Sequence, residues 1–155
     1  MVVRDVMTED PFTIAPDAPL DRASDVMRTK DLRHLPVVDQ AGRLVGIIAE
    51  RDLRRAALAP AVDEDVPAGG RRPLCRPGHA LEDLLVKDVM TCDVLTTHPE
   101  APLANAARVM FERRVGSLPV ILDGRLVGML TEKDVARALA NGRIGGEFDP
   151  AGILW

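Results

Sequence analysis

The hexapeptide Val3-Arg4-Asp5-Val6-Met7-Thr8 decides the fold, because it returns almost unchanged as Val86-Lys87-Asp88-Val89-Met90-Thr91. The same offset of 83 positions carries Leu35-Pro36-Val37 onto Leu118-Pro119-Val120. After a one-residue deletion, Gly42-Arg43-Leu44-Val45-Gly46 returns as Gly124-Arg125-Leu126-Val127-Gly128. Altogether 26 of 53 aligned positions are identical, which identifies the chain as two copies of one unit.

Each copy is predicted to be a small α/β (α+β) unit with the element order β-α-β-β-α. In the first copy, an apolar stripe at Leu20, Ala23 and Met27 indicates a helix that begins after Pro19. Neither unit is large enough to bury both of its faces, so we expect the two to pack as one pseudo-symmetric module. The expected elements are an extended piece at 13–15, a helix from 20, strands at 35–38 and 44–48, a helix at 50–58, a strand at 96, a helix at 103–113, strands at 118–122 and 126–130, and a helix at 132–140.

The composition between and after the copies marks a connector and a tail. Four prolines and the pair Gly69-Gly70 stand between the repeats, as is typical of an irregular segment. We therefore expect repeat one over 1–58, a connector over 59–80, repeat two over 81–140 and a C-terminal tail over 141–155.

Composition excludes several classes of protein. The 155 residues carry 20 Lys+Arg against 24 Asp+Glu, a net charge of -4, and only 3% aromatic residues, which argues against a nucleic-acid binder. The apolar runs are too short to span a bilayer, and the acidic start does not resemble a signal peptide. Two cysteines cannot build a disulfide framework. We expect a soluble, cytoplasmic protein with neither nucleic-acid nor membrane partners.

The ordered motifs resemble the cystathionine-β-synthase (CBS) domain: a Val-Met-Thr start, a Leu-Pro-Val strand and a Gly-x-x-Thr-x-x-Asp ending, over about 3–58 and 86–140. Two such repeats form a CBS pair, or Bateman module. The resemblance implies a stand-alone regulatory protein that binds an adenosyl ligand between its repeats, forms a homodimer and acts on a separate effector protein. It implies AMP, ADP or ATP, with or without magnesium, ahead of S-adenosylmethionine and NAD, and no required cofactor.

The best match to the family's nucleotide motif is Gly128-Met129-Leu130-Thr131-Glu132-Lys133-Asp134. The resemblance implies that Asp134 holds a ribose diol and Thr131 a ribose or phosphate oxygen, in a cleft completed by Thr13, Ile14 and Ala15. The helix start would favour an anion, and Lys133 would add a positive charge. The alternative is structural: Thr-x-x-Asp before an apolar helix is also a capping box.

The corresponding motif of repeat one has an alanine, Ala49, in place of the threonine but keeps Asp52. We expect a second cleft at Asp52, completed by Thr96, Thr97 and His98, that is weaker than the first, dependent on phosphate, or empty. Repeat one also offers Arg33 and His34, where repeat two has Gly116 and Ser117, and the resemblance makes these positions candidate contacts to phosphate or adenine. The alternative for Arg33 and His34 is a solvated loop.

Other functions have less support. Cys75, His79, Cys92 and His98 supply the ligand types of a zinc site or a nucleophilic Cys–His pair, but their spacing matches no zinc knuckle. No phosphate-binding Gly-x4-Gly-Lys loop or Gly-x-Ser-x-Gly elbow is present, so we expect no enzymatic activity. The main alternative is a structural dimerisation module with empty clefts.

Overall fold

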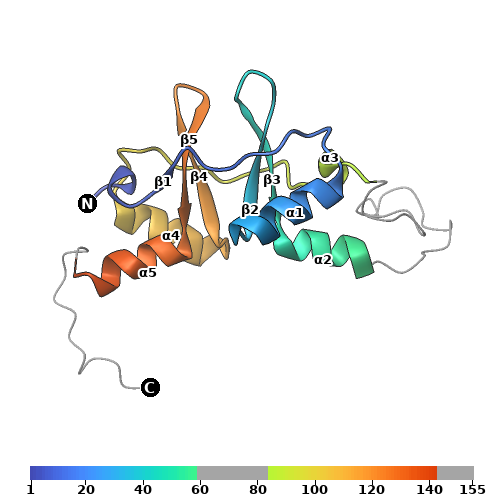
Figure 1. Cartoon of the computed structure of the whole chain (residues 1–155). Coiled ribbons are helices and arrows are strands. Elements are labelled where there is room, and N and C mark those ends of the chain that lie inside the picture. The colour runs from blue at the N-terminus through green and yellow to red at the C-terminus, as the bar shows by residue number, and fades with distance from the viewer. Residues whose placement is uncertain (59–83, 143–155) are drawn as a thin grey trace.

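Two antiparallel hairpins form the centre of the computed structural model, which describes residues 1–58 and 84–142 (Figure 1). The first pairs β2 (His34–Val38) with β3 (Leu44–Ala49), and the second pairs β4 (Ser117–Leu122) with β5 (Arg125–Thr131). Gly42 and Gly124 occupy the turns with φ of 77° and 76°, a backbone conformation that favours glycine.

Four longer helices lie along one side of the molecule, and the hairpin turns point to the other side (Figure 1). They are α1 (Leu20–Lys30), α2 (Glu50–Leu58), α4 (Leu103–Arg113) and α5 (Glu132–Ala140). The apolar stripe of α1, formed by Leu20, Ala23 and Met27, is buried as its spacing predicts. The predicted α+β class with two pseudo-symmetric repeats is therefore confirmed.

The opening segments of the two repeats are exchanged. The short helix η1 (Val3–Asp5) and strand β1 (Thr8–Glu9) belong to repeat one in sequence, yet β1 pairs antiparallel with β5 of repeat two. Reciprocally, α3 (Val86–Val89) leads into Thr91, which exchanges backbone hydrogen bonds of 2.9 Å with Ile47 of β3. Each half of the fold is thus completed by the first residues of the other repeat.

The exchange is fixed by burial as well as by hydrogen bonds. Val3 is fully buried in the core of repeat two, which also contains Leu103 and Leu118. Val86 is likewise fully buried in the core of repeat one, beside residues such as Leu35. Because a fully buried valine contributes about 1.5–3 kcal/mol, these contacts stabilise the exchange substantially.

The described residues include no helix that is long and apolar enough to span a bilayer. Most of the predicted connector and tail lies outside the described residues, which end at 58, resume at 84 and stop at 142. The predicted segment boundaries remain expectations.

Candidate functional site

A cavity of about 470 Å³ lies between the two repeats. Its walls come from β1 and the residues after it, from the end of α1 and the start of β2, and from the junction of β5 with α5. The lining residues are Thr8, Glu9, Asp10, Pro11, Phe12, Asp31, Leu32, Arg33, His34, Pro36, Gly116, Met129, Thr131, Glu132, Lys133, Asp134 and Arg137. The cavity therefore combines the Thr131–Asp134 motif with Arg33 and His34.

Asp134 is buried at the start of α5 and already has three hydrogen-bond donors. Its Oδ2 accepts from the Thr131 backbone N–H at 2.9 Å and from the Thr131 hydroxyl at 2.6 Å. Its Oδ1 accepts from Arg137 Nη2 at 2.6 Å. Thr131 and Asp134 thus form the capping box that the structural alternative predicts. A carboxylate has about four acceptor positions, so Asp134 can accept one further hydrogen bond, and the Arg137 side chain beside it is largely exposed.

His34 lies at the seam between the repeats. A Cβ atom built on Gly116 would lie 3.3 Å from His34 Cε1 and 3.7 Å from Glu132 Oε2, so the absence of a side chain at Gly116 lets the imidazole pack there. Burial lowers the pKa of His34, and the positive charge of Arg51 lowers it further, whereas the Glu132 carboxylate opposes the shift. The imidazole can therefore serve as a neutral hydrogen-bonding group at neutral pH.

The residues 13–15 do not line this cavity. Ile14 is buried in the core of repeat one, where its N–H donates to Pro36 O at 3.1 Å and its carbonyl accepts from Val38 N–H at 3.0 Å. Thr13 and Ala15 are exposed on either side of it. The pairing of β1 with β5 instead brings the preceding residues, Thr8 to Phe12, across the cavity.

The second set of predicted residues is more dispersed. Asp52 accepts the Ala49 N–H at 2.8 Å, the same cap that Asp134 provides in repeat two. Thr97 hydrogen-bonds with β4 through its backbone, and His98 Nδ1 accepts the N–H of Glu100 at 3.2 Å.

Thr96 lines a separate hollow of about 340 Å³ with Arg43 and Cys92, and Asp52 is not among its lining residues. Ser117 is buried and pairs with Thr131 in the β4–β5 ladder, whereas its neighbour Gly116 lines the first cavity. The structure thus does not gather Asp52 and residues 96–98 around one of these hollows.

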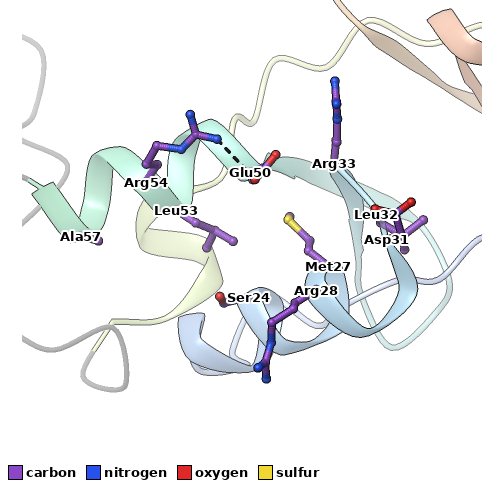
Figure 2. A pocket seen from close by; sticks show the side chains of 10 residues that line it. All are labelled: Ser24, Met27, Arg28, Asp31, Leu32, Arg33, Glu50, Leu53, Arg54 and Ala57. Carbon is purple, nitrogen blue, oxygen red and sulfur yellow. Dashed lines mark ion pairs between the residues drawn. The ribbon is translucent and has the colours of Figure 1, made fainter.

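A larger groove of about 580 Å³ is lined by residues of α1 and α2, among others (Figure 2). It holds the ion pair of Arg54 with Glu50 at 3.3 Å, beside the apolar side chains of Met27 and Leu53. None of the motif residues Thr131, Lys133 and Asp134 lines it. We therefore take the smaller cavity between the repeats as the candidate ligand site.

Two of the four residues of the alternative metal site, Cys92 and His98, lie within the described residues. Within 1–58 and 84–142, no group of three or more His, Cys, Asp and Glu side chains is arranged to hold a metal ion. Cys92 is a free, exposed thiol. Cys75 and His79 lie outside the described residues.

Sequence reasoning missed the acidic residues Glu9, Asp10 and Asp31 of the cavity wall, as well as Phe12 and Arg137. For Arg137 a signal exists, because its i,i+3 spacing from Asp134 places the two side chains on one helix face. Residues 9–12 carry no comparable local signal, since the β1–β5 pairing positions them.

Comparison with known proteins gives a consistent picture. The family model of the CBS domain matches residues 3–59 and 86–141. A homoserine O-acetyltransferase of Methanococcoides burtonii is 34% identical over 138 residues, which are 88% of this chain and 24% of that enzyme. The chain thus spans about a quarter of the length of that relative.

Among solved structures, the CBS domain pair of MJ0100, in complex with 5′-methylthioadenosine and S-adenosyl-L-methionine, superposes with a TM-score of 0.73 at 25% identity. That match covers 91% of this chain and 97% of the other. CBSX2 in complex with AMP superposes with a TM-score of 0.71 at 27% identity, covering 90% and 96% of the two chains.

Proposed function

The chain belongs to the CBS domain family, and from this premise we propose that it binds an adenosyl ligand in the cavity between its repeats and regulates a separate effector protein. The observation that carries the proposal is the convergence of Asp134, Thr131 and His34 on one cavity of about 470 Å³. This volume lies within the usual range of small-molecule sites. The AMP and S-adenosylmethionine complexes of similar CBS pairs support the choice of an adenosyl ligand.

The ribose is assigned to Asp134. A carboxylate that faces a diol accepts two hydrogen bonds, and bonds to a charged acceptor contribute about 1.5–3 kcal/mol each. Arg137 now occupies one carboxylate oxygen, and its exposed side chain can move aside when a ribose hydroxyl takes that oxygen. Thr131 keeps the carboxylate oriented through its N–H and hydroxyl.

Regulation follows from the origin of the cavity walls. A bound ligand would contact the crossing segment Thr8–Phe12, the start of β2 and the start of α5 at the same time. It would therefore favour the arrangement of the two repeats in which these three elements fit it best. An effector that binds one arrangement better than the other would then respond to the ligand.

The decisive experiment compares Asp134→Asn with Asp52→Asn by isothermal titration with AMP and with S-adenosylmethionine. Both substitutions weaken an equivalent helix cap, since each aspartate accepts the N–H of its N-cap residue. Only Asp134 lines the cavity, so we expect at least a tenfold loss of affinity, about 1.4 kcal/mol, in Asp134→Asn alone. Equal affinities in both variants would refute the ribose assignment. Absence of binding to the native protein would favour a structural module with empty clefts.

We further propose that the protein is a homodimer that pairs through its helical side. Phe111 on α4 is 85% exposed and Leu139 on α5 is 56% exposed, so both apolar side chains are accessible to a partner. A second copy would cover them. Light scattering after gel filtration should give twice the chain mass for the native protein, and Phe111→Asp should give a monomer. A native monomer would contradict the proposal.

A further inference from the structure

The charged side chains around the ligand cavity are mostly acidic. Carboxylates come from Glu9, Asp10, Asp31, Glu132 and Asp134, whereas the permanent cations are Arg33, Lys133 and Arg137. Asp134 and Arg137 neutralise each other at 2.6 Å. His34 adds little positive charge at neutral pH, because burial lowers its pKa.

The other four carboxylates lie on exposed residues. Within residues 1–58 and 84–142, no ion pair involves Glu9, Asp10, Asp31 or Glu132. Lys30 lies near the rim, with its Nζ 4.9 Å from the ring centroid of Phe12. The cavity lining therefore holds four carboxylates without an ion pair and the two unpaired cations Arg33 and Lys133, with Lys30 close by.

Two of these carboxylates are held in place by the exchanged segment. Thr8 and Glu9 pair with Met129 and Gly128 of β5, so Glu9 belongs to a strand rather than to a free tail. Asp10 follows directly with a positive φ of 45°. The fold therefore positions the backbone that carries these two carboxylates.

We propose that the cavity selects adenosyl ligands whose 5′ substituent carries at most one phosphate or a positive charge, and that it discriminates against di- and triphosphates. The inference rests on the proposed adenosyl site and names its ligand class. Each added phosphate brings more negative charge toward carboxylates that form no ion pair, and like charges repel. A sulfonium or amine at the same place would be attracted.

Isothermal titration of the native protein with AMP, ATP and S-adenosylmethionine, in magnesium-free buffer at neutral pH, tests the selectivity. We expect AMP and S-adenosylmethionine to bind at least tenfold more tightly than ATP. Raising the salt concentration from about 0.05 M to about 0.5 M should strengthen ATP binding, because shorter screening lengths weaken repulsion. A site dominated by cations would show the opposite salt dependence.

Two double variants test whether the acidic residues of the cavity wall cause the preference for AMP over ATP. Glu9→Gln with Asp10→Asn removes two negative charges, and asparagine tolerates the positive φ at position 10. Asp93→Asn with Glu112→Gln removes the same charge from exposed residues that do not line the cavity. The first variant should narrow the preference for AMP over ATP at least threefold, and the second should leave it unchanged.

The outcomes separate the two proposals. Binding of ATP as tightly as AMP, with affinity that falls as salt rises, would overturn the selectivity and leave the adenosyl site in place. Equal changes in both double variants would also overturn it, because the effect would then come from net charge. Failure of all three ligands to bind the native protein would overturn the adenosyl site itself and, with it, the selectivity.

Discussion

The side chain of Met7 lies directly over Gly128 of the opposite repeat. A Cβ atom at Gly128 would be 2.6 Å from Met7 Sδ and 3.1 Å from the Thr8 carbonyl oxygen. The pseudo-symmetric pair repeats the contact, since a Cβ at Gly46 would be 2.5 Å from Met90 Sδ. The two motifs that reveal the duplication, Val-Met-Thr and the second glycine of Gly-Arg-Leu-Val-Gly, are therefore the two sides of one interface.

Gly128→Ala should lower the free energy of unfolding by about 1–3 kcal/mol, the usual cost of overpacking. The added methyl group must displace the Met7 side chain, while the Thr8 carbonyl leaves little room. Urea denaturation of the single variants and of Met7→Ala with Gly128→Ala measures the coupling. The double variant should lose less than the sum of the single variants. A Gly128→Ala protein as stable as the native one would contradict this contact.

Val3→Ala should destabilise the whole protein although Val3 stands near the chain start. Its side chain is fully buried in the core of repeat two, so its truncation should cost about 1–3 kcal/mol. Val86→Ala should have a comparable effect on the core of repeat one. Val2→Ala, at a half-buried neighbour, is the control, and thermal unfolding gives the comparison. A negligible effect of Val3→Ala would show that the opening segment is not part of the core.

Thr131→Ala should lower the free energy of unfolding by about 1 kcal/mol, because it removes the 2.6 Å hydrogen bond of the hydroxyl to Asp134. It recreates the arrangement of repeat one, where Ala49 keeps only the backbone bond to Asp52. Thr131→Ser retains the hydroxyl and should recover most of the loss. Chemical denaturation distinguishes the variants, and equal losses in both would assign the effect to packing.

Stability should fall as the pH drops below about 6.5, in part because of His34. The pKa of His34 is lowered in the folded protein by burial and by Arg51 and Arg33, against the opposing charges of Glu132 and Asp52. The unfolded chain, with the ordinary pKa of 6.5, therefore binds the proton more readily, and protonation favours unfolding.

His34→Gln should flatten the dependence of the melting temperature on pH between about pH 5 and about pH 7. His98→Gln, at an exposed histidine, is the matched control. Identical pH profiles for the native protein and His34→Gln would show that protonation of His34 does not contribute to the pH dependence of stability.

Local patterns predicted most of the fold. The α2, α4 and α5 helices have the predicted bounds, and the hairpins lie at the expected residues, because apolar periodicity and turn glycines act over short distances. The β1–β5 pairing could not be predicted in this way. Thr8 and Glu9 are both exposed and form a two-residue strand whose partner residues are 121 and 119 positions away.

The candidate site likewise contains residues that a local motif predicts and residues that only the tertiary structure brings together. Thr131 and Asp134 form a contiguous motif, so their placement together follows from the sequence. Asp31 and Phe12 meet them only because the chain crosses between repeats, and Ile14 is withdrawn into the core by its bonds to β2. Contacts made where the chain crosses from one repeat to the other produce no periodic pattern in the local sequence, so they could not be predicted from it.

Because the opening segments are exchanged, the sequence repeat is not the unit that folds: each hydrophobic core needs residues from both repeats. A peptide of residues 1–58 would carry η1 and β1 with nothing to cover Val3, and would lack the segment that covers its own Gly46. Two such peptides could satisfy each other by trading these segments. Because the two copies are covalently joined, this exchange is intramolecular, and the protein resembles a domain-swapped dimer whose two protomers are fused into one chain.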